Sequence, residues 1–349
     1  MKQTKFFLAV FGAVLLASCS SSDDSPAPLG AYDNGFFVLN EGNATSGSIT
    51  YINSDLTVSE QDAFTAVNGT AHSIGGYVQS IFFDGDKAYI ISNGSNKITV
   101  VNRYTLAYIA TVDTGLSVPR YGVVYNGKAY VTNLNTFGST TDDYVAVINL
   151  STLAVEAPIA VNDFADHIIA HNGKIYVANG SFGDGNHVTV IDAATKTIEK
   201  SLAVGQSPNS MEMIGDALFV LCGSYTGDSQ LYRIDTVDDT IIDSVTFAGS
   251  LDNAQNLDIE GNRFYFTVGA KIYSAALNAI AVNDTPLADT QSNSMFIGYG
   301  FAVHNGRIYI SEAADNFTSD GKIFIYSTSG TFIKEMPVGL GPNGFFFND

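Results

Sequence analysis

The sequence predicts an all-β protein made of one unit that repeats seven times. A motif in which a tight turn leads into an aromatic strand recurs along the whole chain. The recurrence has a spacing of about 45 residues, which is typical of one four-stranded blade. No window shows the sustained 3.6-residue periodicity of an amphipathic helix.

The repeated motif is clearest at Asn126–Val131, Asn172–Val177 and Asn305–Ile310, where an Asn-Gly pair is followed by a basic residue, an apolar residue and a tyrosine. Asn-Gly between two apolar runs is the strongest short signal for a β-hairpin. Looser copies begin at Asn34, Gly85, Gly215 and Gly261. The seven aromatic residues at the equivalent position are Phe37, Tyr89, Tyr130, Tyr176, Phe219, Tyr265 and Tyr309.

Each unit is expected to contain four antiparallel strands. The innermost strand, such as 121–125, precedes the turn and the aromatic strand follows it; a third strand such as 188–191 and an edge strand such as 197–203 complete the unit. The C-terminal segment 342–347 matches an innermost strand, and 34–37 resumes with the next one. The two ends of the chain therefore complete one blade, which closes a seven-bladed β-propeller over residues 32–349.

The N-terminus has the pattern of a secretory signal. Lys2 and Lys5 precede an apolar run, and small residues lead to Cys19. The order Leu16-Ala17-Ser18-Cys19 resembles a bacterial lipobox, and this resemblance implies a lipid on Cys19. We therefore expect a signal peptide over 1–18 and a lipid anchor with a flexible tether over 19–31, a stretch that is polar and contains proline. The alternative is an ordinary signal peptide with an incidental cysteine. No other apolar run is long enough to cross a bilayer, so lipid would be the only membrane attachment.

The charge of the chain limits its partners. Without Lys2 and Lys5 the remaining 14 basic and 35 acidic residues give a formal charge of −21. Such a surface repels nucleic acids and anionic headgroups. Cys222 lies in an apolar run and is expected to be a buried strand residue without a disulfide partner.

Motifs for catalysis and for cofactors are missing from the sequence. There is no metalloprotease, esterase or phosphate-binding motif, and there is no tryptophan. A stretch at 315–321 resembles a calcium loop only faintly, because Phe317 and Ser319 occupy expected ligand positions. Asp166–His167 is the one candidate acid–base pair, and alternation along a strand would direct the two side chains to opposite faces. We therefore expect neither an enzyme nor a cofactor.

Candidate ligand-binding residues follow from the geometry of the repeat. Consecutive strands run antiparallel, so the start of each innermost strand and the end of each second strand must meet around one mouth of the channel. Amides, one arginine, one histidine and aromatic residues there would suit a polar ligand with an apolar body. The alternative is that the amides only cap strand ends. The candidates are Gln79, Arg120, Tyr121, His167, Asn209, Gln255, Tyr299 and Asn343 from the first set, and Asn133 and Asn179 from the second.

Two resemblances add an expectation about function. Tyr130-Val131-Thr132-Asn133 is the signature of the bacterial YVTN-repeat propellers, and the likeness covers about 32–349. The segments 36–43, 78–80, 119–121 and 128–133 also resemble a group of outer-membrane surface lipoproteins. Acidic residues soon after Cys19 resemble a surface-export signal.

The resemblance to the surface lipoproteins implies a corrinoid ligand, vitamin B12, that is handed to a TonB-dependent transporter at the cell surface. Two other functions stay open: a scaffold propeller of another outer-membrane complex, and a lyase or lactonase, for which Asp166 and His167 are the only candidates.

Overall fold

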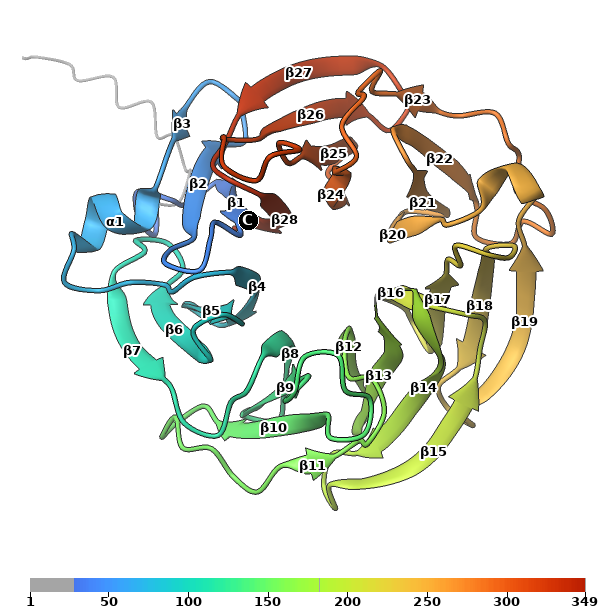
Figure 1. Cartoon of the computed structure of the whole chain (residues 1–349), viewed down its shortest axis with the longest axis horizontal. Helices are drawn as coiled ribbons and strands as arrows, with labels where there is room; N and C mark the ends of the chain where they lie inside the picture. Colours follow the sequence, from blue (N-terminus) through green and yellow to red (C-terminus); the bar gives the residue numbers. More distant parts are fainter. Residues whose placement is uncertain (1–27, 182, 349) are drawn as a thin grey trace, which may run out of the picture.

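The computed structural model describes residues 28–181 and 183–348, and these form a ring of seven four-stranded antiparallel sheets (Figure 1). The predicted fold class is confirmed. The predicted signal peptide and Cys19 lie outside the described residues.

Six blades are formed by consecutive strands, with the innermost strand first. Blade 2 contains β4 (Val78–Asp84), β5 (Lys87–Ser92), β6 (Lys97–Asn102) and β7 (Tyr108–Val112); blade 3 contains β8 (Pro119–Tyr125), β9 (Lys128–Asn133), β10 (Tyr144–Asn149) and β11 (Ile159–Ala160); blade 4 contains β12 (Ile168–His171), β13 (Lys174–Ser181), β14 (Asp184–Asp192) and β15 (Thr197–Ala203). Blade 5 contains β16 (Pro208–Ile214), β17 (Ala217–Cys222), β18 (Gln230–Asp235) and β19 (Thr240–Thr246); blade 6 contains β20 (Gln255–Glu260), β21 (Arg263–Val268), β22 (Lys271–Ala276) and β23 (Ala288–Asp289); blade 7 contains β24 (Ile297–His304), β25 (Arg307–Glu312), β26 (Lys322–Ser327) and β27 (Phe332–Pro337).

Blade 1 combines both ends of the chain, as the sequence predicts. Its order is β28 (Pro342–Phe347), β1 (Gly35–Asn40), β2 (Ser48–Asn53) and β3 (Ser59–Glu60). β28 and β1 pair antiparallel, with Phe36 opposite Phe347. Because β28 covers the inner edge of β1, the ring closes without an unpaired inner edge at this blade.

A clamp from blade 2 secures this closure. Arg103, in the turn after β6, donates from Nε to Oδ1 of Asn348 at 2.5 Å and from Nη2 to the carbonyl of Phe347 at 3.2 Å. Asn348 donates in turn to the carbonyls of Tyr32 and Arg103, both at 2.8 Å. The guanidinium also lies 4.1 Å from the ring centroid of Phe83. The last described residues are thus tied to two blades at once.

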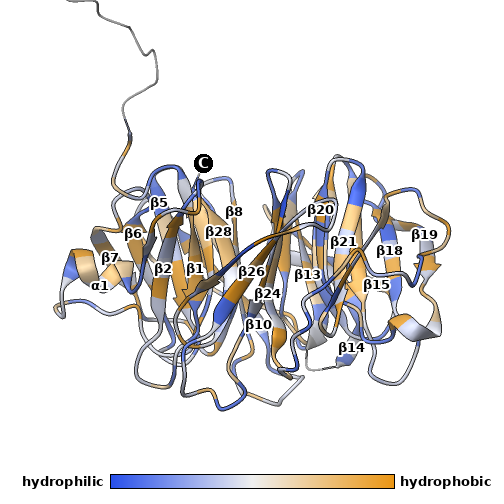
Figure 2. Cartoon of the chain, turned by 90° about the horizontal axis from the view of Figure 1, so that it is seen from above, coloured by the Kyte–Doolittle hydropathy of each residue, from blue (hydrophilic) through white to orange (hydrophobic). Residues whose placement is uncertain are grey.

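The seven aromatic residues of the motif lie on the second strand of each blade and are all buried, between 0% and 4% exposed. They fill the space between neighbouring sheets, where apolar residues are concentrated (Figure 2). The Asn-Gly turns have positive φ at both residues, for example 48° at Asn126 and 72° at Gly127, as a type I′ hairpin requires. Cys222 is buried in β17, also as expected.

Short helical segments are the part of the fold that the sequence did not predict. They are α1 (Ala63–Asn68) and a 3₁₀ turn, η1 (Gly249–Leu251). Six residues are too few to show a helical periodicity. α1 buries Ala63 and Phe64 against blade 1, where the outer strand β3 has only two residues. Within the described ranges, neither helical segment has the length and apolarity that a membrane span requires.

The two faces of the ring carry different parts of the chain. β1 begins beside the end of β28, so residues 28–34 and the C-terminal end share one face, which is uppermost in Figure 2. The innermost strands of all blades begin at the opposite face. That opposite face carries the candidate site.

Candidate functional site

A cavity of about 660 Å³ opens at the mouth of the central channel, on the face where the innermost strands begin. This volume lies in the usual range for small-molecule sites. Every blade contributes to it. The lining residues are Glu41, Tyr77, Gln79, Asn93, Val118, Arg120, Tyr121, Phe137, Asp166, His167, Gly180, Gly183, Ser207, Asn209, Tyr225, Gln255, Asn256, Gly298, Tyr299 and Asn343.

The structure brings together eight of the ten residues that the sequence singled out. These eight line the cavity: Gln79, Arg120, Tyr121, His167, Asn209, Gln255, Tyr299 and Asn343. They come from positions up to 264 residues apart in the chain. The repeat explains this, because each lies at or next to the start of an innermost strand.

Asp166 and His167 both line the cavity, so the expectation that they point to opposite faces is wrong. Both residues lie opposite one residue of β13: Asp166 donates its N–H to the carbonyl of Ala178 at 3.2 Å, and the carbonyl of His167 accepts the N–H of Ala178 at 2.9 Å. Two residues opposite one break the alternation of side chains, as in a β-bulge.

The same irregularity recurs in other blades. In β8 the pairing with β9 changes register between Pro119 and Gly122, and Arg120 and Tyr121 between them both line the cavity. In β20 the register changes after Gln255, and Gln255 and Asn256 both line it. Because of these bulges at the start of the innermost strand, two consecutive side chains of a blade line the cavity instead of one.

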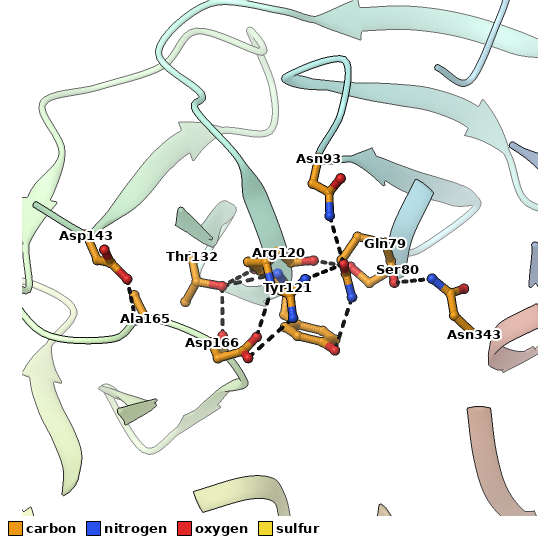
Figure 3. Close-up of polar contacts among 10 residues, drawn as sticks. All are labelled: Gln79, Ser80, Asn93, Arg120, Tyr121, Thr132, Asp143, Ala165, Asp166 and Asn343. Carbon is orange, nitrogen blue, oxygen red and sulfur yellow. Dashed lines mark hydrogen bonds and ion pairs between the residues drawn. The ribbon is translucent and has the colours of Figure 1, made fainter. Parts of the chain in front are cut away.

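Arg120 is the centre of a buried polar cluster (Figure 3). Its Nε and Nη2 face the two carboxylate oxygens of Asp166 at 3.2 and 3.4 Å, and Nη1 donates to Oε1 of Gln79 at 2.5 Å. The side chains of Arg120 and Asp166 are only 14% and 8% exposed. Although burial lowers it, the pKa of Arg120 is raised overall because Asp166 stabilises the charged form. The guanidinium charge is thus matched within the protein.

Tyr121 joins this cluster to His167. Its hydroxyl accepts a hydrogen bond from Nε2 of Gln79 at 3.2 Å, and its ring stacks on the imidazole at 4.0 Å between centroids. Burial, reinforced by the charge of Asp166, raises the pKa of Tyr121 to about 12. Burial lowers the pKa of His167, so the imidazole is neutral at pH 7.

A second polar group lies at Glu41, directly after β1. Tyr299 donates its hydroxyl to Oε2 of Glu41. The Glu41 backbone bridges two segments, because its N–H donates to Gly341 at 2.7 Å and its carbonyl accepts from Val78 at 3.0 Å. Burial raises the pKa of Glu41, and the Tyr299 hydrogen bond and the Arg120 charge oppose that rise.

Three exposed aromatic side chains lie along one part of the mouth. Tyr77, Phe137 and Tyr225 line the cavity and are 41%, 69% and 66% exposed. They belong to blades 2, 3 and 5, whereas the lining from blades 6, 7 and 1 is rich in amides and contains Glu41. The cavity therefore has a polar floor and a rim that is aromatic on one side.

Residues 34–348, nearly all of the described chain, match a family model described as "Domain of unknown function (DUF5074)". The chain belongs to the DUF5074 family. A comparison with curated proteins gave no match.

Solved structures with the same fold include three propellers with low sequence identity to this DUF5074 domain. BamB from Moraxella catarrhalis is 12% identical over 89% of this chain and 85% of that chain, with a TM-score of 0.54. Apo AztD from Citrobacter koseri is 12% identical over 89% and 96%, with a TM-score of 0.53. The dihydro-heme d1 dehydrogenase NirN, in complex with DHE, is 13% identical over 93% and 77%, with a TM-score of 0.57. These identities show a shared fold only.

Asn133 and Asn179 of the DUF5074 domain lie behind the cavity wall and not in its lining. Both are fully buried. Asn179 donates to the carbonyl of Phe164 at 2.5 Å, and Asn133 accepts the N–H of Ser117 at 2.9 Å. The two residues thus hold the segments that lead into Asp166 and Arg120. Their position agrees with the alternative interpretation, in which these asparagines fix strand ends.

Two further residues support the segment that carries Asp166. Thr132 donates its hydroxyl to the carbonyl of Asp166 at 2.7 Å, and Oδ2 of Asp143 accepts the N–H of Ala165 at 3.0 Å (Figure 3). Asp143 is fully buried, and burial raises its pKa to about 7. Sequence reasoning missed both residues, because nothing in a single repeat marks a contact made between blades.

Three lining asparagines also connect neighbouring blades. The side-chain amide of Asn343 donates to the carbonyl of Val78 at 2.8 Å, that of Asn209 to Ala254 at 2.9 Å, and that of Asn256 to Gly298 at 2.9 Å. These amide N–H groups are used within the ring. Only the other polar atoms of these asparagines are therefore left to contact a ligand in the cavity.

The described residues contain no group of three or more His, Cys, Asp or Glu side chains placed to hold a metal ion.

Proposed function

We propose that this domain is a surface lipoprotein that binds a corrinoid at the channel mouth and delivers it to an outer-membrane transporter. The observation that carries the proposal is the cavity of about 660 Å³, to which all seven blades contribute side chains. Such convergence of amides and aromatic rings on one concave site is what a large ligand with polar edges requires.

The chemistry of the lining suits a corrin ring. Gln255 and the remaining N–H of the Gln79 amide provide hydrogen-bonding groups for the amide side chains at the ring's edge, while Tyr77, Phe137 and Tyr225 offer apolar area for the macrocycle. Among the fold neighbours, NirN is named for a haem substrate. That name is a precedent for a macrocyclic ligand on this architecture.

The course of the chain is compatible with a lipid anchor. Residues 28–34 enter β1 on the face opposite the cavity, next to the end of β28. A lipid on Cys19 would therefore hold the domain by its far face and leave the mouth open to a ligand or a transporter. The proposed anchor and site do not compete for one surface.

Cobalamin binding tests the proposed function. Mixing the purified domain with cyanocobalamin, followed by desalting, should leave red absorbance on the protein, and calorimetric titration should saturate. Tyr121→Ala should weaken binding about thirtyfold, or about 2 kcal/mol, because its half-buried ring lines the cavity and is held by stacking on His167. Tyr108→Ala, on the outer strand β7, is the matched control and should bind as the parent does. A parent protein that retains no cobalamin would favour the scaffold function instead.

Membrane fractionation tests the anchor. Cys19→Ala should remove the acceptor for lipid, so the variant should leave the membrane fraction as a soluble or unprocessed form. Metabolic labelling with a fatty acid should mark the parent and not the variant. Equal membrane retention of both proteins would contradict lipidation at Cys19.

A further inference from the structure

The cavity has one more acidic group than it has basic groups. Among the described residues that line it, the only arginine or lysine is Arg120, and the acidic side chains are Asp166 and Glu41. Both oxygens of Asp166 face nitrogens of Arg120, at 3.2 and 3.4 Å. The ion pair is therefore complete within the protein, and Glu41 is left as the excess acid.

The Glu41 carboxyl keeps one oxygen for a ligand. Oε2 accepts the hydroxyl of Tyr299, whereas Oε1 takes no hydrogen bond from any residue in 28–181 or 183–348. The backbone of Glu41 is held by Gly341 on one side and Val78 on the other, and the Tyr299 hydroxyl holds the carboxyl. A fixed acceptor on the wall of a cavity is a feature that discriminates between ligands.

Arg120 is the one cationic side chain of the described lining that acts on Glu41 electrostatically, and its hydrogen bonds go to Asp166 and Gln79 and not to Glu41. His167 is neutral at pH 7, and the Gln79 amide oxygen is already directed at Arg120. The whole chain also carries a net negative charge, like Glu41. An anion that enters the mouth thus meets repulsion from Glu41 and from the net negative charge of the chain.

From these contacts we propose that Glu41 determines the charge of the ligand: the cavity accepts neutral or cationic ligands that donate a hydrogen bond to Oε1, and it rejects anions. This inference rests on the proposed binding function of the same cavity. It assigns a specificity role to a residue at the end of β1, far in sequence from the Arg120 cluster.

The test compares ligands of equal shape and different charge. Cyanocobalamin is titrated at pH 7.5 beside its separated monocarboxylic acids, in which one side-chain amide is hydrolysed to a carboxylate. The parent should bind at least one of these acids about tenfold more weakly than cyanocobalamin. In Glu41→Gln, which keeps the size and the acceptor but not the charge, the difference should shrink to within about twofold.

The control is Glu312→Gln. Glu312 lies at the equivalent end of a second strand, in blade 7, but it contacts Lys322 and Ser292 and does not line the cavity. This variant should keep the parent's discrimination. Equal affinity of the parent for all the acids and for cyanocobalamin, or unchanged discrimination in Glu41→Gln, would overturn the inference.

A parent that does not bind cyanocobalamin would refute the proposed function but not the charge rule. The charge rule is then measured with benzamidine, benzamide and benzoate by saturation-transfer NMR. The parent should show more transfer to benzamidinium than to benzoate, and Glu41→Gln should reduce that gap. Equal signals for the three probes, including none, or the same gap in the variant would overturn it.

Discussion

Deleting residues 342–349 should leave the ring open and most of the chain unfolded or aggregated at 37 °C. The deletion removes β28, which covers the inner edge of β1, and also Asn348, which connects Arg103 and Tyr32. Phe345 is 7% exposed and packs against Phe36 and Tyr309, with ring centroids 6.3 and 5.6 Å away. Burying each such aromatic residue is worth about 1.5–3 kcal/mol. Together with the lost strand pairing, the loss is comparable with the 5–15 kcal/mol that usually stabilises a domain.

The thermal midpoint of unfolding is measured by circular dichroism. As a control, the missing strand is supplied as a separate peptide. A synthetic peptide of residues 340–349 should restore the midpoint of the truncated chain, whereas a scrambled peptide of the same composition should not. A truncated chain that unfolds at the parent's temperature would refute closure by β28.

Replacing Asp166 with alanine should destabilise the domain by about 3 kcal/mol and abolish any ligand binding that depends on the Arg120 cluster. The substitution leaves a guanidinium that is 14% exposed without its carboxylate. Removing one partner of a buried ion pair typically costs about 3–5 kcal/mol, because the remaining charge stays desolvated. Urea-induced unfolding at pH 7.5 measures the loss, and calorimetry with cyanocobalamin measures binding.

Two variants show whether the ion pair itself is responsible. Asp163→Ala changes a carboxylate three residues away that is 40% exposed, and it should have little effect on stability. The double variant Arg120→Met, Asp166→Leu should recover most of the lost stability, since no buried charge remains unpaired. It should still fail to bind, because the polar floor is gone. An Asp166→Ala protein as stable as Asp163→Ala would show that Arg120 finds another partner or water.

The repeat in the sequence was sufficient to predict the blades and their closure. Hairpin turns such as Asn126–Gly127 and buried aromatic residues such as Tyr130 are local requirements, and local requirements recur visibly in every copy. The alignment of the copies also located eight residues of the cavity, because residues at equivalent positions of a closed ring must converge on one mouth.

Only the tertiary structure decided which of those residues reach the cavity and what they contact there. The bulge opposite Ala178 directs both Asp166 and His167 into the mouth, and a single extra residue in a strand leaves no mark in composition or periodicity. The burial of Asn133 and Asn179 behind the wall, and the joining of Glu41 to Tyr299 across the two ends of the chain, depend on contacts between blades. The sequence by itself determined the repeated unit because each unit satisfies its own backbone hydrogen bonds. The charge and shape of the site depend on how neighbouring units pack, and this the repeat does not encode.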